Sequence, residues 1–181
     1  MKRRCALLLL AATWLAPRVQ AQQAGPTEYA IKAAFVCKFA GYVEWPPGAF
    51  EQPDSPIVIG VIAEPDVAEQ VARAARGQAI DARPLAVRRL RPGDPLDGLH
   101  VLYVTRSRAA QAQAALAAAQ RQPVLTVTEL DDGDGPAGIV NFVVVANKVR
   151  FDVAPYLAEP VELRISSRML SVARRVVPRA S

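Results

Sequence analysis

Residues 57–62 read IVIGVI, six residues without a polar side chain, and this segment decides the fold class. A strand with one face in water alternates apolar and polar residues, whereas a strand buried on both faces is apolar throughout. The segment 99–104, LHVLYV, has the same character. Four further segments read as strands: 84–90, 124–128, 139–146 and 148–153.

Helical patterns alternate with these strands. They cover residues 27–43, 66–76, 107–122 and about 166–176. Such alternation predicts a single α/β domain with a mixed, mostly parallel six-stranded sheet and helices on both faces. Only Ala146-Asn147-Lys148 can turn the chain between the last two strands, so we expect a C-terminal antiparallel hairpin.

The chain begins like a secretory signal peptide. Met1-Lys2-Arg3-Arg4 is positive, an apolar run follows, and Val19-Gln20-Ala21 fits cleavage after Ala21. The apolar run is too short to cross a hydrocarbon core of about 30 Å as a helix. We expect a Sec-type signal peptide over 1–21, a domain over 22–181, and export to the periplasm of a Gram-negative bacterium; the alternative is an uncleaved anchor.

The amino-acid composition and net charge of the chain exclude several classes of protein. The chain has 181 residues, 51% of them hydrophobic, which suits one packed domain and excludes a disordered chain. The formal charge is +5 with 22 basic and 17 acidic residues, but four of the basic residues lie in the signal segment. Their removal leaves a net charge of +1, which argues against nucleic-acid binding.

After cleavage Cys37 is the lone thiol, since the other cysteine is Cys5. An exported protein with one cysteine forms no internal disulfide. Three alternatives are open: a buried thiol, a free reactive thiol, or half of an intermolecular bridge. The position of Cys37 inside a predicted helix, away from its start, argues against an activated thiolate.

The sequence contains no motif for catalysis, a cofactor or a metal. Glycine fingerprints for nucleotides and the G-x-S-x-G elbow are absent. His100, the single histidine, lies inside a predicted buried strand and reads as a hydrogen-bonded core residue. The acidic segment 131–135, DDGDG, lacks the ligand spacing of a calcium loop and reads as a solvated turn. We therefore expect no enzyme, no cofactor and no metal site.

The first predicted helix is apolar on two sides. Phe35 and Phe39 belong to a bulky face, and alanines with Cys37 form a small-residue face. A helix that is apolar nearly all round is buried on two sides. It either lies between a sheet and another helix, or turns one face toward a partner protein.

Motifs along nearly the whole chain resemble the YfiR family. The resemblance begins with E-Y-x-I-K-A-A-F at 28–35 and V-E-W-P at 43–46. It continues through the following segments: 57–62, HVLYV at 100–104, LTV at 125–127, GIVNF at 138–142, VRFDV at 149–153 and ISSRMLSVA at 165–173. Leu99 stands where many members of the family have a cysteine, so the resemblance implies no redox control through an internal disulfide here.

The resemblance implies a non-catalytic periplasmic regulator, forming a homodimer, that binds and restrains the periplasmic sensor region of a membrane diguanylate cyclase or sensor kinase. Such a regulator would act on cyclic-di-GMP signalling and biofilm formation. The partner interface is expected to include Asp152 and Tyr156, together with Phe35 and Phe39 of the first helix. The alternative is a small solute-binding domain that reports a ligand to a membrane partner from a cleft beyond the carboxyl ends of the parallel strands.

Overall fold

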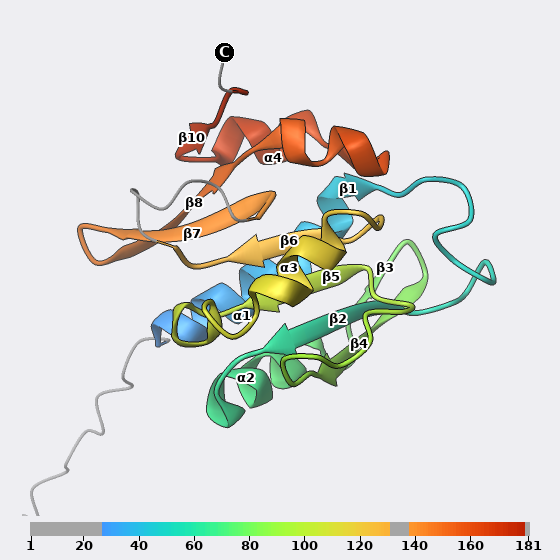
Figure 1. Cartoon of the computed structure of the whole chain (residues 1–181), viewed down its shortest axis with the longest axis horizontal. Coiled ribbons are helices and arrows are strands. Elements are labelled where there is room, and N and C mark those ends of the chain that lie inside the picture. The colour runs from blue at the N-terminus through green and yellow to red at the C-terminus, as the bar shows by residue number, and fades with distance from the viewer. Residues whose placement is uncertain (1–26, 131–137, 180–181) are drawn as a thin grey trace, which may run out of the picture.

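The computed structural model describes residues 27–130 and 138–179. Within them, eight strands form one sheet in the order β10-β8-β7-β6-β5-β2-β4-β3, and β1 pairs separately with β9 (Figure 1). The strands are β1 Val43–Glu44, β2 Ile57–Ile62, β3 Ala79–Ile80, β4 Arg83–Arg89, β5 Val101–Val104, β6 Leu125–Thr128, β7 Val140–Val145, β8 Lys148–Val153, β9 Arg164–Ile165 and β10 Arg175–Val176. The predicted signal peptide at 1–21 and the acidic segment at 131–135 lie outside the described residues.

The fold class is confirmed: a mixed, mainly parallel sheet with helices and a C-terminal antiparallel hairpin. β4, β2, β5, β6 and β7 run parallel, and β8 turns back along β7. Ala146 and Asn147 make the turn with φ of 48° and 58°. All six predicted strands exist; the four that the sequence missed are each two residues long. β1, β9 and β10 arise from long-range pairing, whereas β3 forms a tight hairpin with β4, and strands this short leave no periodic pattern in the sequence.

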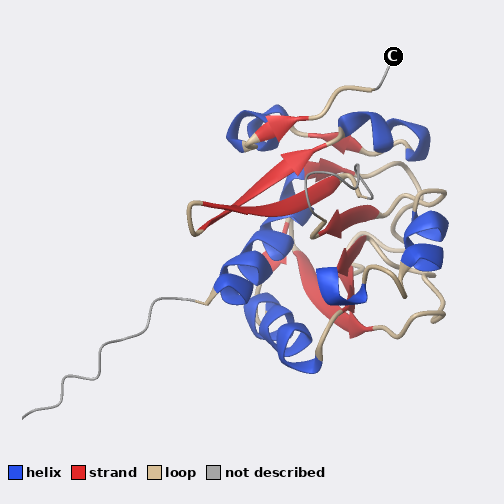
Figure 2. Cartoon of the chain, turned by 60° about the vertical axis from the view of Figure 1, so that its left-hand side comes forward, coloured by secondary structure: helices blue, strands red, loops and turns tan. Residues whose placement is uncertain are grey.

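Helices cover both faces of the sheet (Figure 2). The helices are α1 Glu28–Phe39, α2 Pro65–Ala75, α3 Gln113–Ala119 and α4 Ser167–Val172, with 3-10 turns η1 Ala40–Tyr42, η2 Arg106–Arg108, η3 Pro155–Leu157 and η4 Glu159–Val161. α1 and α2 pack side by side on one face, and α3 packs on the other. A hydrophobic core lies on each face of the sheet, and neighbouring residues of β5 point into different cores. Tyr103 belongs to the core beneath α1 and Leu102 to the core beneath α3.

α1 begins where the sequence predicts, because the Thr27 hydroxyl accepts a hydrogen bond from the Ala30 N–H at 3.3 Å. Phe35 and Phe39 on its bulky side pack against Phe142 of β7 and Phe151 of β8. Its small-residue side lies beside α2. Of the two alternatives for this helix, the structure therefore shows the one in which a sheet and another helix enclose it.

Two predicted helices are shorter than expected. The segment 107–122 splits into η2 and α3, since no side chain caps α3 and its N-cap, Ala112, has a non-helical backbone with φ −93° and ψ 2°. The last helix ends at Val172 instead of about 176. Ala173 is extended, and the next residues become β10 through parallel pairing with β8. The physical reason is a long-range ion pair, described below.

Candidate functional site

The predicted interface residue Asp152 is buried, with 3% of its surface exposed. Its carboxylate accepts hydrogen bonds from Arg174, Nε at 2.7 Å and Nη2 at 2.5 Å, and from Arg175 Nη2 at 2.9 Å. Two parallel N–H bonds from one guanidinium to one carboxylate give a directional, charge-assisted contact. Asp152 therefore clamps β10 against β8, at the position where Arg175 pairs with it in register.

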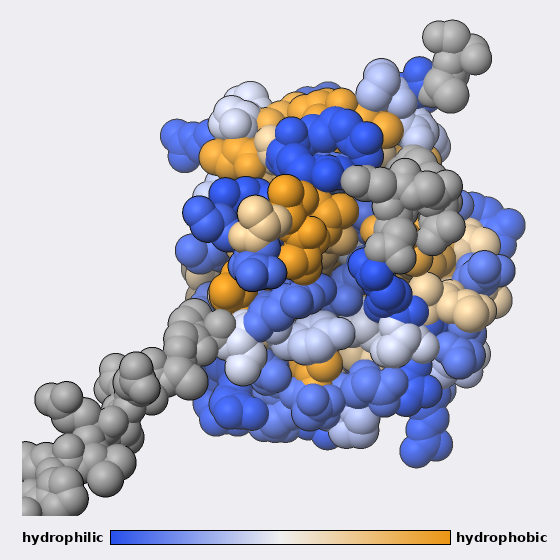
Figure 3. Space-filling model, turned by 90° about the vertical axis from the view of Figure 1, so that its left-hand side faces the viewer, coloured by the Kyte–Doolittle hydropathy of each residue, from blue (hydrophilic) through white to orange (hydrophobic). Residues whose placement is uncertain are grey.

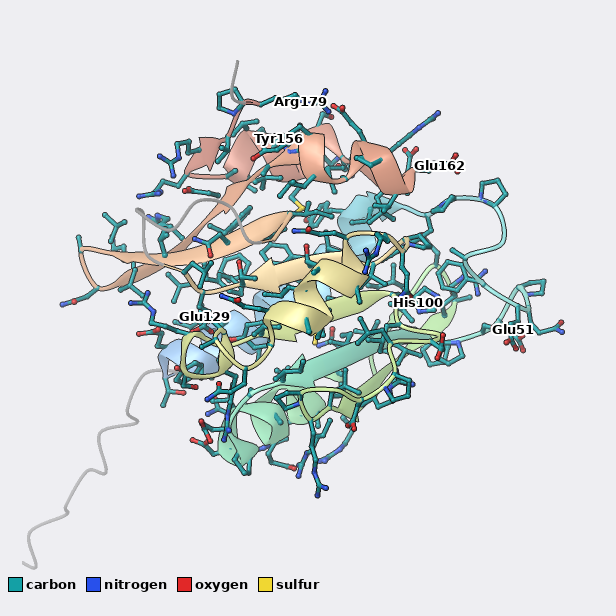
Figure 4. The ribbon with its side chains drawn as sticks, in the orientation of Figure 1. Glu51, His100, Glu129, Tyr156, Glu162 and Arg179 are labelled. Carbon is teal, nitrogen blue, oxygen red and sulfur yellow. The ribbon has the colours of Figure 1, made fainter. Side chains whose placement is uncertain are left out.

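Tyr156 lies on η3 beside the end of this clamped segment. It lines a hollow of about 380 Å³ together with residues of η3 and of the chain from β10 onward. The remaining lining residues are Pro155, Glu159, Val176, Val177, Pro178 and Arg179. Figure 4 shows Tyr156 and Arg179 near each other along the C-terminal side of the molecule. We call this surface, formed by β10, η3 and the hollow between them, the C-terminal face.

The C-terminal face combines an open strand edge with apolar surface. β10 is the last strand in the sheet order and pairs, among the described residues, with β8 alone. Val176 on this strand is 45% exposed. The ion pair of Arg179 with Glu159 across the hollow, at 3.0 Å, is about two-thirds exposed on both sides and adds little stability. An unpaired strand edge beside exposed apolar side chains is a surface suited to binding another protein.

Of the other two predicted interface residues, Phe39 lies inside the protein and Phe35 lies partly at its surface. Phe39 is 2% exposed and Phe35 is half-buried. The Phe39 ring lies 4.9 Å from that of Phe151, measured between centroids. Phe151 directly precedes Asp152 and points to the opposite side of β8. The two phenylalanines thus support the strand that carries Asp152 from beneath, and they do not reach the C-terminal face themselves.

Cys37 is buried and unbridged. Burial raises the pKa of its thiol to about 11. The thiol is therefore protonated at neutral pH and weakly nucleophilic. Among the three alternatives for this cysteine, the structure favours the inert buried thiol.

His100 is a core residue with both ring nitrogens occupied. Nδ1 accepts the Val58 N–H at 3.1 Å, and Nε2 donates to the Ala49 carbonyl at 3.0 Å. The ring stacks on Phe50 at 4.3 Å. This neutral tautomer leaves no nitrogen to accept a proton from a serine, so the imidazole cannot act as a general base in this arrangement. Burial lowers its pKa, more than the Ala49 hydrogen bond raises it.

A buried ion-pair network, absent from our sequence-based predictions, joins α1 to the carboxyl ends of β5 and β6. Lys32 Nζ lies 3.1 Å from Glu129 Oε2 and 2.6 Å from Glu28 Oε1. The Tyr103 hydroxyl donates to the other Glu129 oxygen, and burial with that negative charge raises the tyrosine pKa. Figure 4 places Glu129 beside the start of α1. A lysine within an apolar helix was the only sequence signal for this network. Both carboxylate oxygens are occupied, which fits a structural role.

A second hollow, of about 710 Å³, lies at the opposite end of the sheet from this network. It is lined by Glu44, Trp45, Pro46, Pro47, Glu159, Glu162, Leu163 and Arg164. Trp45 packs against His100, which directly precedes β5, so this groove lies near the amino ends of the parallel strands. The solute cleft predicted from strand topology was expected at the carboxyl ends instead.

Residues 27–130 and 138–179 form neither a cluster of metal ligands nor a helix suited to a bilayer. No group of three or more His, Cys, Asp or Glu side chains there is arranged to hold a metal ion. No helix in these ranges combines the length and apolar character that a bilayer crossing requires.

Comparison with models of protein families gives a match that covers most of the chain. A family model described as YfiR/HmsC-like matches residues 29–174, which include almost all of the described fold. A search of curated proteins found no match.

Replacing Lys32 with methionine tests the buried network. We expect Lys32→Met to lower the free energy of unfolding by about 3–5 kcal/mol, because it leaves the buried Glu129 carboxylate without its cation. Urea denaturation measures this loss. The matched control is Glu28→Gln, which removes the half-exposed side of the same network and should cost below about 1 kcal/mol. Equal losses for the two variants would show that the buried pair does not anchor α1.

We expect the folded protein to lose stability in acid because of His100. Its pKa in the folded protein lies below the ordinary 6.5, so the unfolded chain binds a proton first as the pH falls. The stabilisation that neutral His100 gives to the folded protein is fully present above pH 6.5. It is lost as the pH falls from 6.5 toward the pKa of His100 in the folded protein. Unfolding curves measured across this range should show the decrease in the parent protein. His100→Gln, which carries no titrating ring, should lack it, and an identical slope in both proteins would contradict the assignment.

Proposed function

The chain belongs to the YfiR/HmsC-like family, and on this basis we propose that it is a periplasmic regulator of cyclic-di-GMP signalling. In this proposal it binds and restrains the periplasmic sensor region of a membrane diguanylate cyclase, or of a sensor kinase. Support comes from the family match over residues 29–174 and from the signal-peptide pattern at 1–21. Both nitrogens of the single histidine bind the backbone, and this fits a protein that acts by binding.

The observation that carries the proposal is the C-terminal face. Tyrosine is enriched among the residues that dominate binding energy at interfaces, and Tyr156 borders a hollow that a partner side chain can enter. β10 offers a strand edge next to it. Restraint of a cyclase requires that this surface bind the inactive conformation of the partner more tightly than the active one.

In this proposal Asp152 contributes as a positioning residue. Its carboxylate is turned inward to Arg174 and Arg175, so it orders β10 for the partner without touching the partner. Phe35 and Phe39 act one step further back by supporting β8. The homodimer implied by the family resemblance belongs to the same proposal, and light scattering on residues 22–181 measures it.

The test is capture of the membrane partner by tagged variants expressed with their native signal peptide. We expect Tyr156→Ala to weaken capture by about thirtyfold, as for truncation of an interface hot spot. Asp152→Asn should weaken it less, by loosening β10. The matched control is Gln113→Ala, an exposed residue on α3, a helix that does not line the C-terminal hollow.

Folding is checked by circular dichroism, and cellular cyclic-di-GMP is measured in parallel. Loss of capture should accompany a rise in cyclic-di-GMP like that on deleting the gene. The proposal fails if deletion leaves cyclic-di-GMP and biofilm unchanged and no membrane signalling protein is captured by the parent protein.

The second hollow, which Trp45 lines, favours a second candidate function, that of a solute-binding domain. Its lining combines an indole, two prolines and side chains of both charges, including Glu162 and Arg164. Half of the lining residues are charged and the rest are apolar, so the hollow suits a solute that carries charged groups beside an apolar part. A ligand held there would lie beside η4, whose Glu159 also lines the C-terminal hollow, so occupancy of one hollow could be sensed at the other.

Trp45 itself reports on this candidate. The chain has two tryptophans, and Trp14 lies in the segment expected to be cleaved. The tryptophan fluorescence of residues 22–181 therefore comes from Trp45 alone. A metabolite that enters the groove should change this emission and also raise the melting temperature, because it binds only the folded state. A library that changes neither signal at millimolar concentration would exclude this candidate for the compounds tested.

A further inference from the structure

The hairpin of β7 and β8 extends past the strands on both sides of it. β6 pairs with Val140 and Asn141 of β7, and β10 pairs with Asp152 and Val153 of β8. Within the described residues, the hairpin from 143 to 150 therefore has no neighbouring strand on either edge. Figure 1 shows this two-stranded ribbon projecting from one side of the molecule. We call residues 143–150 the hairpin tip.

The hairpin tip exposes apolar side chains on both of its faces. Val144 is 47% exposed and Val145 is 45% exposed. Neighbours along a strand point to opposite faces, so one valine lies on each side of the ribbon. Figure 3 views the molecule from the side toward which the tip projects, where hydrophobic side chains gather with hydrophilic ones around them. A protein partner covers one face of a ribbon, whereas a lipid layer can surround the whole tip.

Two basic side chains of β8, the second strand of the hairpin, lie close to these valines. Lys148 and Arg150 are exposed, and neither forms an ion pair with any residue that the structure describes. The positive charge of the tip is local, since residues 131–179 as a whole contain seven Lys and Arg against six Asp and Glu.

We propose that the hairpin tip docks on the surface of an anionic phospholipid bilayer. Val144 and Val145 enter the boundary between headgroups and acyl chains, and Lys148 and Arg150 contact the phosphates. Interfacial apolar insertion reaches a depth of about 5–10 Å, which matches two to three residues of a strand. The inference rests on the proposed function for its location, since a regulator of a membrane protein works beside a bilayer. Docking concentrates the protein at that surface and limits its orientation.

The test is flotation of the folded protein with vesicles. One set is phosphatidylcholine alone, and the other is an equimolar mixture of phosphatidylcholine and phosphatidylglycerol. We expect binding to the anionic vesicles, weakened by high salt because exposed charges are screened. Val144→Thr with Val145→Thr keeps the branched side-chain shape and should weaken binding by about tenfold. Lys148→Gln and Arg150→Gln should each weaken it by about fivefold.

Two matched controls make the result specific. Val172→Thr changes the most exposed valine that the structure describes, 67% exposed on α4, and Arg121→Gln removes an exposed charge between α3 and β6. Both should bind anionic vesicles like the parent protein. Failure of the parent to bind anionic vesicles, or equal binding by the tip variants, would overturn the inference.

Capture of the partner in detergent separates this inference from the proposed function. Tip variants should still capture the partner there, and Tyr156→Ala should still bind vesicles. The opposite result has two parts: the tip variants fail to capture the partner in detergent, and the parent protein does not bind vesicles. In that case the tip contacts a protein, and lipid docking is wrong. If vesicle binding follows the expected pattern but no membrane signalling protein is captured, the regulator proposal alone fails.

Discussion

Packing of Phe35 and Phe39 against Phe142 and Phe151 is the interaction on which the C-terminal part of the fold depends. The ring centroids across this contact lie 4.9 to 6.2 Å apart. Each such aromatic pair contributes about 0.5–1.5 kcal/mol beyond the burial of area. The ladder joins two hairpin residues to β6 and two to β10, and the Asn141 side chain adds hydrogen bonds with Thr128 and Leu130. Packing on α1 and these edge contacts together hold the hairpin in place.

This packing determines where the C-terminal face forms. With Phe151 turned toward α1, Asp152 points to the other side of β8, where Arg174 and Arg175 reach its carboxylate. The chain then cannot continue as a helix past Val172 and becomes β10. β10 in turn forms one wall of the hollow beside Tyr156. One aromatic contact in the core thus leads, step by step, to the surface proposed for partner binding.

The sequence predicts the parts of this fold that depend on local patterning. Apolar runs such as 57–62, or alternation of apolar and polar residues as in 148–153, identify the six longer strands, and Thr27 identifies the start of α1. The sequence does not predict β10, because this strand exists through backbone pairing with β8 and through the ion pairs of Asp152, both with residues more than twenty positions away. For the same reason Asp152 reads as an exposed interface residue, although its carboxylate is buried. The Lys32–Glu129 pair likewise joins residues that only the folded sheet brings together.

The most direct measurement of the central claim is site-specific photocrosslinking in living cells. A photoreactive amino acid is placed at Tyr156, at Val176, or at Gln113 on α3, which does not line the C-terminal hollow. The account predicts that the first two positions crosslink to a membrane signalling protein and that Gln113 does not. Crosslinks from Gln113 to that protein, with none from Tyr156 or Val176 in the folded variants, would contradict it.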